Sequence, residues 1–199
     1  MKKIIFASNN EGKIKEVKQI CSDMNVEIIS MKEAGIELDI EENGTTFEEN
    51  ALIKAKAIMK VTGQITIADD SGLEVDYLGG EPGVYSARYM GHDTPYDIKN
   101  QAIIDRLKGV EEKDRTARFV CAMAAVFPDG RHFTTRGTME GIIGYEIKGS
   151  NGFGYDPIVY LPQYQKTSAE LSPEEKNKIS HRGEALEKLK NQLTEYISL

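Results

Sequence analysis

Short apolar runs that alternate with amphipathic segments constrain the fold of this chain more than any other feature. Residues 2–7 (KKIIFA) and 26–30 (VEIIS) are apolar enough for buried strands, and the apolar positions between them recur at helical spacing over residues 11–22. Thr46 and Glu49 form a capping-box pattern that predicts a further helix. Strands that alternate with helices in this way favour parallel pairing.

The second half of the chain predicts hairpins instead. Residues 115–127 and 132–143 have the composition of long strands and flank a Pro-Asp-Gly turn signal, which is typical of antiparallel pairing. Further helices are expected over residues 95–107 and from Ser172 and Ser180 onward. Parallel strands followed by hairpins favour an α/β fold with a mixed sheet.

The composition narrows the classes of function. The 199 residues carry a net charge of −7, which argues against general binding of DNA or RNA, because nucleic acids require a basic face. No apolar run approaches the ~20 residues that cross a bilayer, and the N-terminal apolar run is too short for a signal peptide. We therefore expect a cytoplasmic protein with no membrane partner. Cys21 and Cys121 lack metal-type spacing and are expected to be reduced thiols.

The segment FASNNEGKIKEV passes from a strand into a helix through small polar residues. Ser8 and Glu11 match a capping box, so one interpretation is that Ser8 simply caps the helix. The other interpretation is an anion site, because N–H groups at a helix N-terminus bind phosphate and Lys13 lies within the first turn. The Walker P-loop pattern is absent, so this segment alone is not specific.

Two pairs of adjacent carboxylates are the acidic candidates for a functional site. The strand QITI is predicted to stop at Asp69 and Asp70, and because neighbouring strand residues point opposite ways, one aspartate is expected to face a site while the other packs or caps. Carboxylates at the end of an apolar strand are unfavourable unless compensated, and Mg²⁺ would compensate them. Glu41 and Glu42 share a loop that fits either a metal site or a solvated acidic surface.

Two later segments add groups that suit a nucleotide. GSNGFGYDP surrounds Phe153, Tyr155 and Asp156 with small residues, which fits either a connector with buried aromatics or a loop that stacks a planar ligand. EEKNKISHRG places His181 and Arg182 at a helix start, either as a charged surface or as donors to an oxyanion or a carbonyl. Cations, carboxylates and an aromatic loop together suit a magnesium nucleoside triphosphate. Acyl transfer has little support without a Ser-His-Asp or Cys-His arrangement.

Five segments of the chain resemble the Ham1-like inosine/xanthosine triphosphate pyrophosphatase family. They are SNNEGKIKEV, TTFEENALIKAKA, ADDSGLEVDYLGGEPGVYSARY, GFGYDPI and KNKISHRGEAL, in order and over nearly the whole chain. The resemblance implies a single domain over residues 1–199, an elongated two-lobed α/β fold around a long mixed sheet with the active-site cleft between the lobes, and a homodimer. It also implies Mg²⁺-dependent hydrolysis of ITP, dITP and XTP to the monophosphate and pyrophosphate.

The resemblance also implies roles for individual residues. Asp70 matches the general base and a metal ligand, and Glu41 matches a second metal ligand. Residues 8–13 match the triphosphate segment and residues 153–156 the base loop. The residues implied to contact the nucleotide are Ser8, Asn9, Asn10, Glu11, Gly12, Lys13, Lys54, Ser71, Phe153, Gly154, Tyr155, Asp156, Lys176, His181 and Arg182.

The sequence also suggests how the site could select its base, and it leaves three alternative functions open. His181, Arg182 and the backbone N–H groups of residues 153–156 are candidate donors to the 6-carbonyl of hypoxanthine and xanthine. Adenine would leave such donors unpaired, at a cost of ~1–3 kcal/mol each. The alternatives are a Maf-type pyrophosphatase, which shares the fold but lacks the SHRG block, a nucleotide sensor without hydrolysis, and a structural dimer module.

Overall fold

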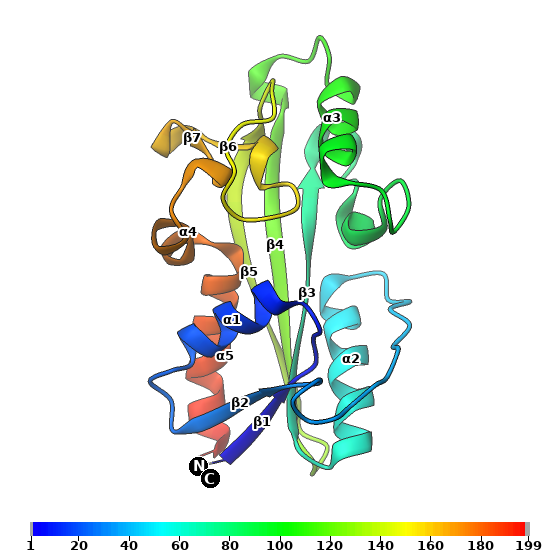
Figure 1. Cartoon of the computed structure of the whole chain (residues 1–199), viewed down its shortest axis with the longest axis vertical. Helices are drawn as coiled ribbons and strands as arrows, with labels where there is room; N and C mark the ends of the chain where they lie inside the picture. The colour runs from blue at the N-terminus through cyan, green and yellow to red at the C-terminus, as the bar shows by residue number, and fades with distance from the viewer. Residues whose placement is uncertain (1, 198–199) are drawn as a thin grey trace. The chain divides into compact units, whose positions relative to one another are not determined.

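The chain folds into a mixed α/β structure around a seven-stranded sheet (Figure 1). The computed structural model describes residues 2–197. The strands are β1 (Lys2–Phe6), β2 (Val26–Ser30), β3 (Ile65–Val75), β4 (Thr116–Val126), β5 (His132–Ile143), β6 (Val159–Leu161) and β7 (Lys166–Thr167). They hydrogen-bond in the order β2-β1-β3-β4-β5-β6-β7. β1 pairs parallel with β2 and β3, whereas β6 pairs antiparallel with β5 and β7, so the predicted mixed sheet is confirmed.

Each predicted helix is present, and its local sequence explains where it starts. The helices are α1 (Glu11–Ile20), α2 (Phe47–Thr62), α3 (Tyr96–Arg106), α4 (Pro173–Ile179) and α5 (His181–Ile197). Ser172 and Glu175 form the capping box of α4, with Pro173 at its first position. Thr46 caps α2 as predicted, but the Glu49 carboxylate accepts from Thr45. None of the helices within residues 2–197 is long and apolar enough to cross a membrane.

The third strand departs from the sequence-based prediction. A stop at Asp69 and Asp70 was expected, yet β3 continues through both aspartates to Val75. Tertiary contacts explain the difference, because the buried strand side chains continue with Leu73 and Val75 beyond the acidic pair. The two carboxylates therefore occupy fixed strand positions instead of a flexible strand end.

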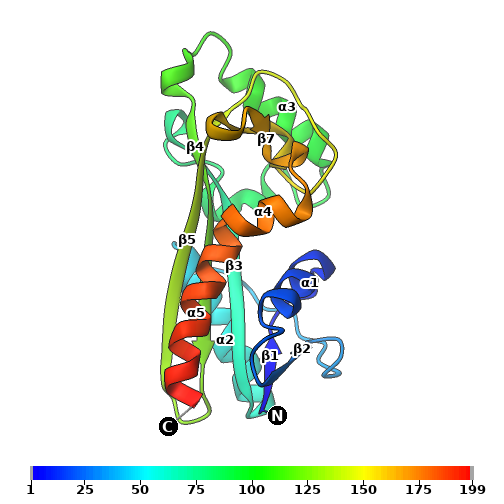
Figure 2. The same ribbon diagram turned by 90° about the vertical axis from the view of Figure 1, so that its left-hand side faces the viewer.

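One compact unit comprises residues 1–70, 121–137 and 182–199. Val17 of α1 and Leu186 of α5 pack with Ile67 of β3 on one face of the sheet, in a cluster that also holds the two free cysteines, Cys21 and Cys121. Ala51, Ala55 and Ile58 of α2 pack with Ala68 of β3 in a separate cluster. Figure 2 shows α5 in front of the long strands and α2 behind them. Helices α1 and α5 thus cover one face of β3, and α2 covers the opposite face.

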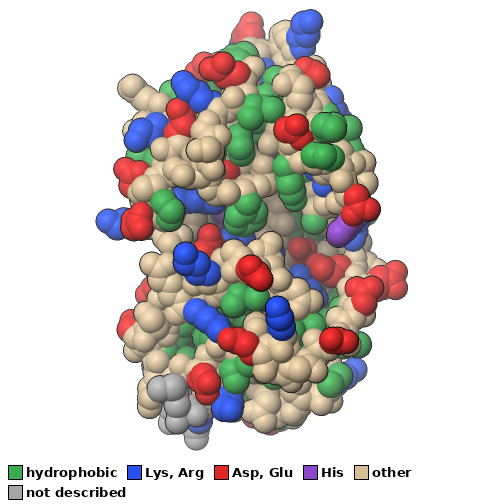
Figure 3. All heavy atoms as spheres, in the orientation of Figure 1, with side chains coloured by type: hydrophobic (Ala, Val, Ile, Leu, Met, Phe, Trp, Pro, Cys, Tyr) green, Lys and Arg blue, Asp and Glu red, His purple; other side chains and the backbone are tan. Residues whose placement is uncertain are grey.

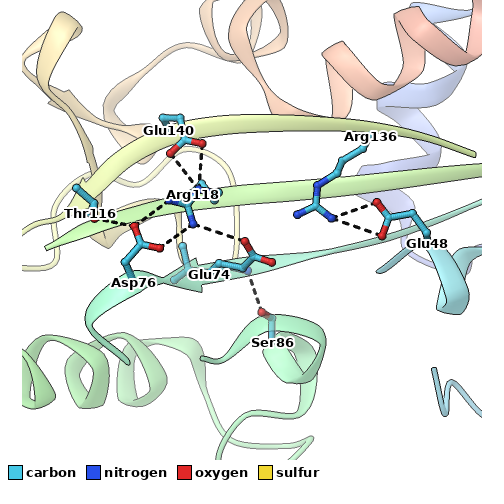
Figure 4. A network of polar contacts seen from close by, with 9 residues as sticks. Glu48, Glu74, Asp76, Ser86, Thr116, Arg118, Arg136 and Glu140 are labelled. Carbon is cyan, nitrogen blue, oxygen red and sulfur yellow. Dashed lines mark hydrogen bonds and ion pairs between the residues drawn. The ribbon is translucent and has the colours of Figure 1, made fainter. Parts of the chain in front are cut away.

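The second unit comprises residues 71–120 and 138–181. Its core joins Leu73 of β3, Ile103 of α3 and Leu161 of β6. On the exposed side of its strands, Arg118 of β4 forms ion pairs with Asp76 at 2.8 Å and Glu140 at 3.0 Å (Figure 4). Because these partners follow β3 or lie on β5, the arginine cross-links neighbouring strands of this unit.

Candidate functional site

The N-terminus of α1 carries the first predicted site residues. Asn10 caps the helix, because its Oδ1 accepts from the backbone N–H of Lys13 at 3.1 Å. The Ser8 hydroxyl oxygen accepts from the N–H of Asn10 at 3.2 Å, so the predicted Ser8–Glu11 capping box is wrong. Ala7 still donates to the β3 backbone, and the chain needs the intervening residues to turn into the helix. The exposed residues of this turn are Asn9, Asn10, Glu11 and Gly12.

Asp69 lies on the face of β3 that α1 and α5 cover, and its carboxylate interacts with two cationic side chains. Its Oδ2 is 2.8 Å from Lys13 Nζ and 3.9 Å from Arg182 Nε. The residue is only 1% exposed, and burial alone would favour its neutral form. The positive charges of Lys13 and Arg182 outweigh burial and hold the pKa of Asp69 below its usual range. Asp69 is therefore a permanently charged anchor for these cations.

Asp70 has the opposite electrostatic character. As strand alternation predicts, it lies on the other face of β3, where Asn50 of α2 donates to its Oδ2 at 3.0 Å. Burial raises the pKa of Asp70 to about 6, although Lys54 and the Asn50 hydrogen bond act in the other direction. The charge of Glu42 adds to the increase. Two adjacent aspartates thus have separated proton affinities, one below the usual range and one above it.

Lys54 lies on α2 one turn after Asn50. Its Nζ is 3.2 Å from Glu42 Oε2. Burial lowers the pKa of Lys54, but Asp69, Glu42 and Asp70 together more than reverse that effect. Glu41, the predicted second metal ligand, is exposed in this structure, while its neighbour Glu42 pairs with the lysine. Glu42 is thus the carboxylate of this loop that pairs with Lys54 and whose charge acts on Asp70, and the metal-ligand role of Glu41 stays a prediction.

Arg182 also belongs to the charged cluster of the first unit, which comprises Lys13, Lys54, Asp69, Asp70 and the residues that pair with them. It is 2% exposed, donates to Glu16 of α1, and lies near Asp69. The sequence predicts a contact between this arginine and the base. In the structure its guanidinium contacts Glu16 and Asp69, and the contact with the base stays a prediction. Arg182 is positioned by two anions from different elements, which gives its guanidinium a defined place before any ligand arrives.

The second unit carries the predicted base loop, which is braced from within by Asp156. Asp156 is 2% exposed, and its Oδ2 accepts from the Phe153 N–H at 2.8 Å and from Lys176 Nζ at 2.7 Å. Its Oδ1 accepts from the Ser168 hydroxyl at 2.7 Å. These internal bonds show that Asp156 and Lys176 hold the shape of the loop.

Phe153 is the exposed aromatic of this loop, at 44%. It lies between Gly152 and Gly154, whose φ values of +72° and +66° favour glycine. A Cβ on Gly152 would also lie 2.1 Å from the Asp156 carboxylate. Lys176 Nζ is 5.2 Å from the centroid of the Phe153 ring. The loop is therefore built to present one ring, backed by a buried cation.

The remaining predicted residues of this unit are more enclosed. Tyr155 is 4% exposed, and its hydroxyl donates to the Ser86 carbonyl at 2.6 Å. His181 is 5% exposed and stacks on Phe119 with ring centroids 5.0 Å apart. Ser71 is half-buried on β3. Tyr155 is thus a buried aromatic that supports the loop from behind. This is one of the two roles that the sequence predicts for the aromatics of this segment.

Two residues that hold the charged cluster escaped the sequence analysis. Asn50 is 1% exposed and hydrogen-bonds to Asp70, and Glu16 pairs with Arg182. A signal existed for Asn50, because it is a polar residue on the apolar stripe formed by Phe47, Ala51 and Ile58. Within the described part of the chain, no three His, Cys, Asp or Glu side chains gather as a complete metal site.

The fold and these groups define the class of protein. It is a mixed α/β protein in which a cluster of cations and carboxylates suits a polyphosphate. A glycine-flanked aromatic ring suits a planar group. The Ham1 family model matches residues 4–192. A dITP/XTP pyrophosphatase of Bacillus licheniformis is 52% identical over 95% of this chain and 96% of the relative, and one of Clostridium perfringens is 49% identical over 97% and 98%.

Solved structures agree with these sequence relatives. A HAM1 protein from Coxiella burnetii superimposes with a TM-score of 0.91 at 43% identity, covering 98% of this chain and 100% of its own. The Staphylococcus aureus Ham1 protein gives 0.89 at 44% identity with the same coverage. The chain belongs to the Ham1 family.

Proposed function

We propose that this protein hydrolyses non-canonical purine nucleoside triphosphates, dITP, ITP and XTP, to the nucleoside monophosphate and pyrophosphate. Relatives about half identical over nearly their full length carry the name dITP/XTP pyrophosphatase. The observation that supports it most is the pair Asp69 and Asp70, with one carboxylate holding Lys13 and the other next to Lys54. That arrangement supplies both charge neutralisation and a carboxylate base.

The donor set of the first unit fits Mg²⁺. This ion takes one or two carboxylates and completes its shell with water and phosphate oxygens, so it does not need three protein ligands. Asp70 and Glu42, with Glu41 beside them, would hold it. A buried carboxylate of raised pKa such as Asp70 gains from a nearby cation. When bound, the ion would neutralise charge on the phosphates and polarise them.

The side chains of the first unit would then perform the reaction. Lys13 and Lys54, with the N–H groups at the start of α1, would bind the triphosphate oxygens and favour departure of pyrophosphate. Asp70 would orient a water and accept its proton as the water attacks the α-phosphorus. Asn50 fixes the Asp70 carboxylate for this step by donating to Oδ2.

The loop of the second unit would select the base. The Phe153 ring is exposed enough to stack on a purine. Of the candidate donors to the 6-carbonyl, the N–H groups of Phe153 and Asp156 already bond within the loop, so the proposal rests on those of Gly154 and Tyr155, together with His181 and Arg182. An amine at that position, as in adenine, would leave a buried donor unpaired, at a cost of about 1–3 kcal/mol.

We further infer that residues 1–199 act as one catalytic domain in a cytoplasmic homodimer that does not bind nucleic acid. The assembly is an inference from the family resemblance. The last point has support from the net charge of −7 and from the face drawn in Figure 3, on which Lys and Arg side chains are interspersed with Asp and Glu.

A nucleotide panel with pyrophosphate detection tests the proposal. With Mg²⁺, pyrophosphate should appear from dITP, ITP and XTP much faster than from ATP or GTP, and EDTA should stop the release. Binding without pyrophosphate release would establish a sensor, and preference for other bases would favour a Maf-type activity. Either result would overturn the proposed function.

A further inference from the structure

Asn50 occupies an unusual place in the charged cluster. It is a carboxamide 1% exposed, on the apolar stripe of α2, and it uses both ends of its side chain. Its Nδ2 donates to Asp70 Oδ2 at 3.0 Å, and its Oδ1 accepts from the backbone N–H of Gly44 at 2.8 Å. One rigid amide therefore joins β3 to the acidic loop that contains Glu41 and Glu42.

The packing at Gly44 is a second, independent sign of this connection. A Cβ at position 44 would lie 2.7 Å from Asn50 Oδ1 and 2.7 Å from Glu49 Cβ. Real Cβ atoms do not approach so closely, so the loop backbone rests directly on the asparagine. One turn further along α2, Lys54 pairs with Glu42 at 3.2 Å. Consecutive turns of α2 thus fasten the acidic loop at two points.

This connection determines how two carboxylates face a common ligand. Asp70 comes from β3 and Glu42 from a loop that precedes α2, so nothing in the chain's covalent structure fixes their separation. Asn50 holds Asp70 directly and holds the Glu42 loop through Gly44. Groups behind metal ligands commonly fix the orientation of those ligands, and their loss lowers metal affinity or activity by ~10- to 100-fold.

We propose that Asn50 is a positioning residue that sets the relative geometry of Asp70 and the Glu42 loop for a divalent cation. This inference rests on the proposed function, since it names a part of the same site. It assigns Asn50 no contact with the nucleotide. Its loss should therefore weaken metal binding and the chemical step and leave substrate affinity nearly unchanged.

The test uses Asn50→Leu, which keeps the volume of the side chain and removes both hydrogen bonds. Mn²⁺ binding to the metal-free full chain, measured by electron paramagnetic resonance, should weaken by about 10-fold or more. In turnover assays kcat should fall by about 10- to 100-fold, while KM for dITP changes by less than about 3-fold. A fall in kcat with little change in KM distinguishes a positioning role from a general loss of structure.

Asn100→Leu is the matched control. Asn100 is 2% exposed on α3 and also donates one amide hydrogen bond, to the Gly154 carbonyl at 3.0 Å. Its substitution should leave Mn²⁺ affinity within about 2-fold, although it also loses the amide hydrogen bond of a buried asparagine. If Asn50→Leu does not fold, Asn50→Ser decides, because the smaller side chain leaves room for water at the Gly44 N–H.

The outcomes separate the two proposals. Wild-type affinity for Mn²⁺ in the Asn50 variant overturns the positioning role, as does an equal loss in the Asn100 variant or a wild-type protein that holds no Mn²⁺. Failure of the wild type to release pyrophosphate from dITP, with Mn²⁺ binding intact and sensitive to Asn50, overturns only the proposed function.

Discussion

The charged cluster around Asp69 and Asp70 and the loop around Phe153 differ in how their charged groups are paired. In the first, Lys13, Lys54 and Arg182 share a few carboxylates, and one of these, Asp70, keeps a pKa raised to about 6. In the second, Asp156 is satisfied by partners from its own unit, and only the Phe153 ring is widely exposed.

The contrast assigns different work to the two regions. A cluster that gathers several cations and carboxylates in a partly buried place favours a ligand that carries charges of both signs, such as a metal polyphosphate. A loop whose carboxylate is already satisfied from within offers shape and an apolar ring, which suits a flat base. Substitutions in the charged cluster should therefore change turnover, and substitutions behind the loop should change stability.

The largest expected effect is the loss of turnover in Asp70→Asn. The amide keeps the size of the side chain but cannot accept a proton from water, so kcat for dITP should fall by ~10²- to 10⁴-fold. Asp93→Asn, which removes the same charge from a fully exposed position, is the control and should keep normal turnover. Pyrophosphate release measures both. Turnover within 10-fold of wild type in Asp70→Asn would remove Asp70 from the role of base.

The next effect concerns the brace behind the loop. Asp156→Asn leaves the Lys176 ammonium, whose side chain is 8% exposed, without its carboxylate partner. Breaking a buried pair in this way costs about 3–5 kcal/mol in the free energy of unfolding. Denaturant unfolding should show this loss, and the double variant Asp156→Asn/Lys176→Met should recover part of it. A loss below 1 kcal/mol would mean that the pair does not brace the loop.

These comparisons also show how far the sequence could predict the structure. The mixed sheet followed from helices between early strands and a turn signal between later ones, and both patterns are local. The opposite orientation of Asp69 and Asp70 followed from strand geometry alone. The continuation of β3 past Asp70 did not, because it depends on burial of Leu73 and Val75 in a core assembled from distant segments.

The partners of the site residues were less accessible to prediction. The sequence marked Lys13, Lys54 and Arg182 as cations, but not that Glu16 and Asp69 would hold Arg182. Glu41 and Glu42 are equivalent by composition, and only the fold of their loop brings Glu42 to Lys54. Pairings between residues far apart in the chain depend on tertiary geometry, which a single sequence does not specify.

A smaller effect should appear in the stability of the metal-free protein. The folded-state pKa of Asp70, raised to about 6, exceeds the unfolded value near 3.9, so its contribution to stability is present below pH 4 and is lost as the pH rises through 6. The difference amounts to about 3 kcal/mol, given 1.36 kcal/mol for each pKa unit. In EDTA, Asp70→Asn should therefore be more stable than wild type at pH 7.5, with little difference at pH 4. An equal difference at both pH values would contradict the raised pKa.

The smallest effect tests the aromatic of the loop. Phe153→Ala removes a stacking surface worth about 1–3 kcal/mol for a base, so KM for dITP should rise by ~5- to 150-fold with kcat less affected. Phe153→Tyr, which keeps the ring, should retain most of the affinity. Tyr164→Ala is the matched control, because Tyr164 is an aromatic of the same unit with 43% exposure against 44% for Phe153. If both alanine variants raise KM equally, exposure of aromatic surface in general, and not the position of Phe153, accounts for the loss, and the division of work between the loop and the charged cluster would have to be abandoned.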